Sequence, residues 1–319
     1  MPYDDSVPPT RRARPLLAAA LASLCLTVAG CGGGGGEDGT ARSQPRPGSG
    51  ADASVPASPS GPVSPSGPVS TPPGSTRPGT EPAKPPASEE PKPPRGPLTG
   101  RTVVIDPGHN PRNREHTREI GRQVDIGTGT KECDTTGTST NGGYAEALFT
   151  LDVSHRLRDL LRARGAEVKL TYDNDRAFGP CVDERARIGN EAGADAVLSV
   201  HADGSAAGNR GFHVILPARV RSGAADTSKI VEHSADLGAR IAGNFLRTTG
   251  TAPSNYIGGK TGLDTRGDLG GLNLSTVPKV FIECGNMRDP KDAALLTSGS
   301  WRQKAAQGMA DGITSYLKG

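Results

Sequence analysis

The sequence predicts a three-layer α/β/α domain built on a mostly parallel or mixed sheet, and two observations support this prediction. From residue 98 onward, short apolar runs of the kind found in strands alternate with longer segments whose apolar residues recur at helical spacing. The proline- and glycine-rich repeats lie before residue 98, so residues 98–319 have the composition of one ordinary domain, long enough to bury a core. Strands that alternate with helices favour helices on both faces of the sheet.

The first half of this domain is predicted to contain two strands, a long loop and a helix. The apolar run at residues 102–106 predicts a buried strand, which ends at a Pro-Gly pair. Residues 110–143 have no regular pattern, and a loop of that length inside a compact domain usually has a function. Leucines at helical spacing predict a helix over residues 144–164, which Gly165 ends, and a strand follows at residues 167–171.

The second half continues the same alternation. Apolar runs predict the strands, and apolar residues three or four positions apart predict the helices. In chain order we expect a short polar helix at 182–192, strands at 195–201 and 211–216, a long helix at 228–248, a strand at 277–284 and a helical tail at 289–317.

The first residues of the chain have the pattern of an export signal. A segment with several arginines precedes an apolar run over residues 16–29, which is short for a transmembrane helix. The run ends in Val-Ala-Gly-Cys, which resembles the processing box of bacterial lipoproteins, where the cysteine is lipidated. We therefore predict a lipoprotein signal at residues 1–31 with lipidated Cys31; the alternative is an ordinary secretion signal with an incidental cysteine.

Residues 32–97 have a composition that predicts a disordered linker. They begin with a run of glycines and continue as repeats of proline, serine and glycine, which offer too little apolar surface to offset the entropy of ordering. The chain is thus expected to be exported and to reside at the outer face of the membrane or in the cell wall. We expect a monomer whose contact with the membrane is the lipid anchor.

Charge and composition exclude nucleic acid as a partner. The net charge is only +3, from 37 basic and 34 acidic residues, and 3% of the residues are aromatic. Nucleic-acid binding would need a basic patch with stacking aromatic side chains. From residue 98 onward, no segment is apolar for long enough to span a membrane.

Three cysteines follow the predicted signal, and a pair of them can persist as a disulfide outside the cytoplasm. Cys133 and Cys181 lie in polar, loop-like sequence, whereas Cys284 lies in the apolar strand near the C-terminus. Of the three possible pairings we favour Cys133 with Cys181. Cys284 is then expected to be a buried free thiol.

Two histidines follow apolar strand sequence directly. If the strands before His109 and His201 lie in one sheet, both imidazoles project from the same edge. Glu146, in the first turn of the predicted helix, could face that edge, and two histidines with one glutamate are a known catalytic zinc set. Glu283, at the end of the last strand, could be the carboxylate that moves a proton. Asp106 could be a further ligand, but before Pro-Gly it is expected to hydrogen-bond the turn.

Longer motifs around these residues resemble one family. The segments are VIDPGH at residues 104–109, ADAVLSVHAD at 194–203 and PKVFIECGN at 278–286. They are similar to blocks of the zinc-dependent N-acetylmuramoyl-L-alanine amidases, the type 3 cell-wall amidases. Matching blocks occur in family order across residues 101–318 and not in the first hundred residues.

This resemblance implies a fold, a reaction and a set of site residues. It implies one α/β catalytic domain, here residues 98–319, with a sheet of about six strands. It implies that His109, Glu146 and His201 bind Zn²⁺ and that Glu283 is the catalytic acid and base. The implied reaction is cleavage of the peptidoglycan amide between N-acetylmuramic acid and L-alanine. The alternatives are a zinc peptidase that cuts within the stem peptide and a non-catalytic lipoprotein that binds wall fragments.

The chain departs from the family pattern at a few positions. Thr150 stands where the family usually has Asn, and Tyr172 stands where Arg is frequent. His213 replaces an acidic residue in the strand after the second histidine of the site. The last two departures could alter recognition of the stem peptide, and none of the three removes a predicted ligand.

Three residues are candidates for substrate binding. Arg185 could bind a substrate carboxylate through two hydrogen bonds, or it could pair with Asp183 or Glu184 on its own helix. His213 could bond substrate or serve in packing. Asn286 could contact substrate, although after a strand it more commonly caps or turns the chain.

Overall fold

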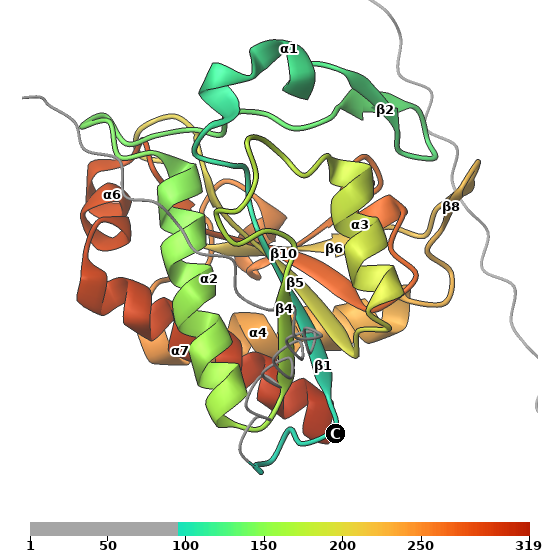
Figure 1. The fold of residues 1–319 in the computed structure, drawn as a ribbon. Helices are drawn as coiled ribbons and strands as arrows, with labels where there is room; N and C mark the ends of the chain where they lie inside the picture. The colour runs from blue at the N-terminus through green and yellow to red at the C-terminus, as the bar shows by residue number, and fades with distance from the viewer. Residues whose placement is uncertain (1–94) are drawn as a thin grey trace, which may run out of the picture. The chain divides into compact units, whose positions relative to one another are not determined.

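The computed structural model describes residues 95–319, and the predicted signal, Cys31 and most of the predicted linker lie outside the described residues. A six-stranded sheet with the order β4-β1-β5-β10-β6-β9 forms the centre (Figure 1). All neighbours in it are parallel except β10 and β6. The predicted mixed α/β sheet is therefore confirmed. Its strands are β1 (Thr102–Pro107), β4 (Glu167–Leu170), β5 (Ala196–Asp203), β6 (His213–Pro217), β9 (Leu263–Arg266) and β10 (Lys279–Asn286).

Helices cover both faces of this sheet. On one face lie α2 (Glu146–Ala163), α4 (Val231–Thr249) and α7 (Gly299–Lys318), and their apolar stripes form the main core with the strands. On the other face lie α3 (Val182–Glu191) and the short α5 (Gly270–Asn273). Figure 1 shows α2 and α7 opposite α3. Because strand residues alternate between faces, one face is almost wholly apolar while the α3 face also carries polar side chains.

The predicted helical tail consists of two helices. The first is α6 (Pro290–Leu296), whose N-terminus is capped by Asp289, with Pro290 at the first position. Ser298 then accepts a hydrogen bond from the main chain of Trp301 and starts α7. The predicted single tail is therefore divided into α6 and α7 at Ser298, the residue that caps the second helix. Among residues 95–319, no helix is both long and apolar enough to cross a membrane.

The segment predicted as a long loop contains short elements and lies above the carboxyl ends of the parallel strands (Figure 1). It holds the 3₁₀ turn η1 (Asn113–Glu115), α1 (Thr117–Ile120) and a hairpin of β2 (Gln123–Asp125) and β3 (Thr130–Glu132). A disulfide joins Cys133, directly after the hairpin, to Cys181 at the start of α3. The predicted pairing is confirmed, and Cys284 is free and buried as expected.

Several short elements were not predicted from the sequence. The edge strand β9 and helix α5 have four residues each. Strands β7 (Arg221–Ser222) and β8 (Ala225–Asp226), of two residues each, pair as a hairpin. The 3₁₀ turn η2 (Gly258–Lys260) precedes β9. Elements this short leave little periodic pattern, so only the tertiary fold reveals them.

Candidate metal centre and active site

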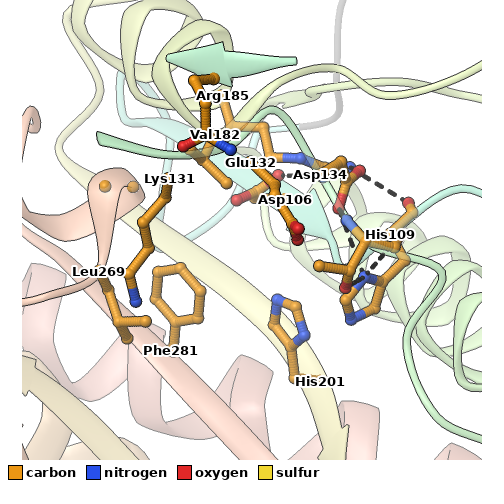
Figure 2. A pocket seen from close by; sticks show the side chains of 14 residues that line it. Asp106, His109, Lys131, Glu132, Asp134, Val182, Arg185, His201, Leu269 and Phe281 are labelled. Carbon is orange, nitrogen blue, oxygen red and sulfur yellow. Dashed lines mark hydrogen bonds and ion pairs between the residues drawn. The ribbon is translucent and has the colours of Figure 1, made fainter. Parts of the chain in front are cut away.

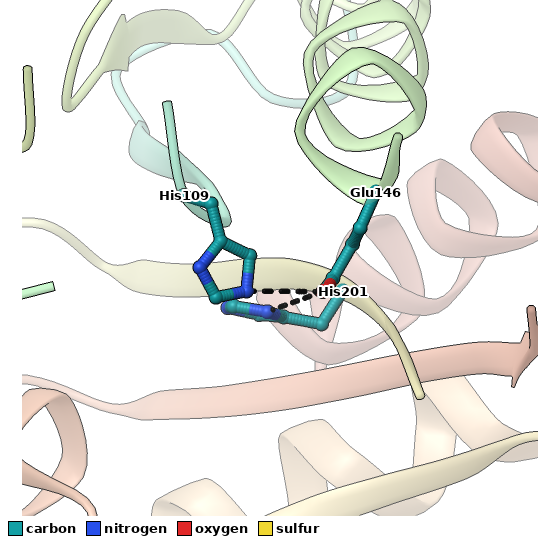
Figure 3. A group of neighbouring side chains, drawn as sticks. All are labelled: His109, Glu146 and His201. Carbon is teal, nitrogen blue, oxygen red and sulfur yellow. Dashed lines mark hydrogen bonds and ion pairs between the residues drawn. The ribbon is translucent and has the colours of Figure 1, made fainter. Parts of the chain in front are cut away.

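Three of the predicted site residues meet at the carboxyl edge of the sheet. His109 follows β1, Glu146 opens α2 and His201 lies in β5 (Figure 3). Oε1 of Glu146 lies 3.2 Å from Nε2 of His109 and 3.0 Å from Nδ1 of His201. One ligand atom from each residue lies within 4.8 Å of the others, so the group could hold a metal ion.

The local chain is shaped for this convergence. His109 adopts a left-handed backbone conformation with φ of 60°, which is uncommon for a residue other than glycine. Directly before it, a Cβ on Gly108 would lie 2.3 Å from Cε1 of His201, so only glycine lets the turn pass the imidazole. Thr150 donates to the main-chain oxygen of Gly108 over 2.7 Å and thereby holds the turn against α2. This is a structural use for one of the departures from the family pattern.

Charges within the group reinforce one another. Burial alone would raise the pKa of Glu146, but the two histidines outweigh it and hold that pKa far below its usual range. Burial likewise disfavours the charged form of His109, yet the carboxylates of Glu146 and Asp134 raise the pKa of His109 well above 6.5. A buried carboxylate between two imidazoles is a site that favours a cation.

Glu283 lies next to this group in the sheet. In the strand register it is opposite His201 on one side and His213 on the other. It is partly buried, and its Oε2 has no hydrogen-bond partner among the described residues. Burial raises the pKa of Glu283 well above its ordinary value, and the nearby charges of Glu146 and Asp203 raise it further. A carboxyl group with a raised pKa can accept a proton and later return it.

A cavity of about 570 Å³ opens beside the two histidines. Figure 2 shows His109 and His201 at one end of it and Lys131 and Leu269 at the other. The ring of Phe281 stacks on His201 with centroids 5.2 Å apart and also lines the cavity. The cavity therefore offers an apolar wall next to the candidate metal ligands, with charged groups at its rim.

The structure favours a structural role for Arg185. Its side chain is buried, and its five N–H groups donate to three main-chain oxygens and to the carboxylates of Asp106 and Asp134. No donor is left for a substrate. The expected pairing with Asp183 or Glu184 is wrong, because Arg185 points to the sheet while Glu184 pairs with Arg176.

The other two substrate candidates differ from each other. Asn286 is buried; its amide donates to the main chain of residues 205, 206 and 209 and its oxygen accepts from residues 205 and 288, so it shapes the turn. His213 is buried beside Glu283 and Tyr256, and its Nδ1 has no partner among the described residues. Burial lowers the pKa of His213, so it is neutral near pH 7. A substrate contact by His213 stays a prediction.

Asp106 serves neither as a ligand nor in the turn after β1. It is buried and pairs with Arg185 at 2.7 Å and with Lys279 at 3.1 Å. It also accepts hydrogen bonds from Thr171 and Ser199. The expectation of a turn contact is therefore wrong, because two cations from distant elements converge on this carboxylate.

Two residues near the site were not among the sequence-based candidates. Phe281 lies in the last strand, two residues before Glu283, so the alternation of the strand places both on one face. Asp134 directly follows Cys133. The predicted disulfide at Cys133 was the one sequence feature that indicated a fixed position for Asp134. Its contact with His109 depends on the tertiary fold.

Comparisons with known proteins agree with this arrangement. The sequence pattern of the N-acetylmuramoyl-L-alanine amidases matches residues 103–315. An N-acetylmuramoyl-L-alanine amidase of Mycobacterium tuberculosis is 44% identical over 221 residues, which cover 69% of this chain and 88% of that protein. The chain belongs to the N-acetylmuramoyl-L-alanine amidase family. The resemblance inferred from the sequence motifs is thus confirmed.

Two solved structures of this family have the same fold. They are the amidase Ami1 from Mycobacterium smegmatis and the apo form of Ami1 from Mycobacterium abscessus. Each is 41% identical to this chain with a TM-score of 0.63 and covers 69% of it. The alignments cover 98% and 100% of those two chains.

The donor set fits the metal that such an amidase needs. Two imidazole nitrogens and one carboxylate oxygen come from three separate elements, as in hydrolytic metal sites. The carboxylate is also fixed from behind, because Oε2 of Glu146 accepts the main-chain N–H of Thr138 at 2.9 Å. Oε1 is thereby directed at the two histidines.

Proposed function

We propose that this chain hydrolyses the amide bond between N-acetylmuramic acid and the L-alanine of the peptidoglycan stem peptide, with zinc as its cofactor. The convergence of His109, Glu146 and His201 beside a cavity, in a chain of the amidase family, carries this proposal. Nitrogen and carboxylate ligands with room for a further group suit zinc. When bound, zinc supplies Lewis acidity toward the amide carbonyl and makes water a stronger acid.

Glu283 is the proposed general base and acid. Its place opposite His201 in the register, its orphaned Oε2 and its raised pKa support this role. It takes the proton from the attacking water and then gives it to the nitrogen of the leaving L-alanine. Phe281, packed on His201, gives the cavity an apolar wall beside this site.

Export and anchoring belong to the same proposal. The pattern of residues 1–31 supports an export signal with lipidation at Cys31, and residues 32–97 then connect the anchor to the catalytic domain at 98–319. A disulfide in the domain is consistent with an oxidising compartment. The enzyme would thus act on the cell wall as a monomer tethered to the membrane.

Digestion of purified peptidoglycan followed by mass spectrometry tests the reaction. The proposal predicts intact stem peptides that begin with alanine, together with glycan whose lactyl group is a free acid. A zinc chelator should abolish both products, and added zinc should restore them. Shortened stem peptides would indicate a peptidase instead, and binding of wall fragments without hydrolysis would indicate a non-catalytic protein.

A further inference from the structure

His109 has a second ring nitrogen, which faces away from Glu146. Its Nδ1 lies 3.3 Å from Oδ1 of Asp134, 3.1 Å from the main-chain oxygen of Thr135 and 3.2 Å from the Thr135 hydroxyl. A histidine that binds metal through one nitrogen commonly donates the N–H of the other to a carboxylate or carbonyl, which fixes the tautomer and the ring plane. Of these three groups, Asp134 is the one that carries charge.

Asp134 is itself held by a buried cation. Nη2 of Arg185 lies 2.9 Å from Oδ2 of Asp134, and both side chains are buried. The same nitrogen donates to the main-chain oxygen of His109 at 3.2 Å. One guanidinium therefore holds both the left-handed turn at His109 and the carboxylate beside its ring (Figure 2).

We propose that Asp134 is a positioning residue for the metal site. Its carboxylate faces Nδ1 of His109 beside the Thr135 acceptor, and its negative charge favours the proton on that nitrogen and so presents Nε2 of His109 toward Glu146 and the metal. Arg185 keeps the carboxylate in place. This inference rests on the proposed function, because it takes His109 as a metal ligand.

The disulfide supports the same arrangement. Cys133 directly precedes Asp134, and Cys181 lies at the start of α3, the helix that carries Arg185. The bond thus joins the segment that holds the carboxylate to the helix that holds its cation. Without it, only noncovalent contacts, such as the ion pair of Asp134 with Arg185, would hold the two segments together.

The affinity of the full chain for zinc, measured by competition with a chelator, tests the proposal. Asp134→Asn keeps the shape of the side chain but removes the charge that faces His109 and Arg185. Loss of a group that orients a ligating histidine typically costs about 10- to 100-fold in metal affinity, and we expect a decrease of that size. Equal zinc affinity of the wild type and Asp134→Asn would overturn the proposal.

Glu132→Gln is the matched control. Glu132 lies two residues earlier in the same segment, lines the same cavity and is exposed, so the variant removes one negative charge in the same region. Its side chain makes no hydrogen bond or ion pair among residues 95–319. We expect its zinc affinity to equal that of the wild type. An equal decrease in both variants would mean that net charge, and not the contact with His109, sets the affinity, and would contradict the proposal.

A spectroscopic measurement needs no variant and covers the case in which Asp134→Asn does not fold. In nitrogen NMR spectra of the zinc-loaded wild-type chain, the proton of His109 should reside on Nδ1 and the zinc on Nε2. The main-chain oxygen of Thr135 can accept the same proton, so the difference in zinc affinity between Asp134→Asn and Glu132→Gln, and not this spectrum alone, separates the charge of Asp134 from a merely structural role. Zinc on Nδ1 would overturn the proposal. If the wild type binds no zinc, both the proposed function and this inference fail. If the wild type and Asp134→Asn bind zinc equally well, only this inference fails.

Discussion

Glycines determine how closely the chain can approach the candidate ligands. Gly137 has φ of 70°, and a Cβ there would lie 2.7 Å from Cδ2 of His109 and 2.8 Å from Oε2 of Glu146. Neither neighbour can move without disturbing the metal-binding geometry. Gly143, a few residues later in the same segment, has φ of 85°, and a Cβ there would have nothing within 4 Å. Alanine variants at these two positions would therefore share the cost of backbone strain, but only the variant at Gly137 would add a steric clash.

Gly137→Ala should weaken zinc binding, because its methyl group displaces His109 and Glu146. We expect a decrease of about tenfold, comparable to losing a group that orients a ligand. Gly143→Ala carries the same left-handed backbone cost of about 1 kcal/mol but should bind zinc as the wild type does. Chelator competition measures both variants. Unchanged zinc affinity in Gly137→Ala would show that the glycine does not limit the site.

At the scale of elements, the predictions held where periodicity was long. The helix after Gly143 and the strands that precede both site histidines were predictable because apolar residues recur over many positions. The edge strand β9 and helix α5 were missed because four polar or glycine-rich residues carry no period. The hairpin of β2 and β3 was missed for the same reason. Its place depends on tertiary contacts, such as the packing of Val124 against Cys133 and Cys181.

The disulfide should contribute much of the stability of the segment over the site. Cys133 and Cys181 are 48 residues apart, and closing a loop of that length stabilises the folded state by about 4 kcal/mol in the chain-entropy description. The double variant Cys133→Ser/Cys181→Ser should lose free energy of unfolding of that order. Urea unfolding of the metal-free protein measures it. A loss well under about 1 kcal/mol would indicate that other contacts hold the segment without the bond.

At the scale of the whole molecule, buried charges connect elements that are remote in sequence. Asp106 in β1 meets Arg185 from α3, 79 residues later, and Lys279 from β10, 173 residues later. Asp134 joins the network through Arg185. The candidate ligands could be predicted because each belongs to a sequence motif at a strand end or helix start. The buried charge network could not be predicted from the sequence, because no local pattern shows which cation faces which carboxylate.

These carboxylates should make the domain sensitive to acid. Lys279 and Arg185 outweigh burial at Asp106, and Arg185 and His109 outweigh it at Asp134, so both pKa values are depressed in the folded state, that of Asp134 to about 2. A group whose folded pKa is depressed stabilises the protein above its unfolded pKa of about 3.9, and this stabilisation is lost as pH falls. Urea unfolding of the metal-free protein should show a decline from about pH 5 toward about pH 2, on the order of 2 kcal/mol from Asp134 alone. Asp134→Asn should have a shallower decline, and identical pH profiles would contradict this attribution.

The central claim is that Glu283 moves protons beside a metal held by His109, Glu146 and His201. Parallel measurement of zinc content and of muropeptide hydrolysis in Glu283→Gln tests it most directly. The account predicts the same zinc content as the wild type and a hydrolysis rate lower by about 10²- to 10⁴-fold, the usual contribution of a general acid–base group. Hydrolysis at the wild-type rate by the zinc-loaded variant would contradict it.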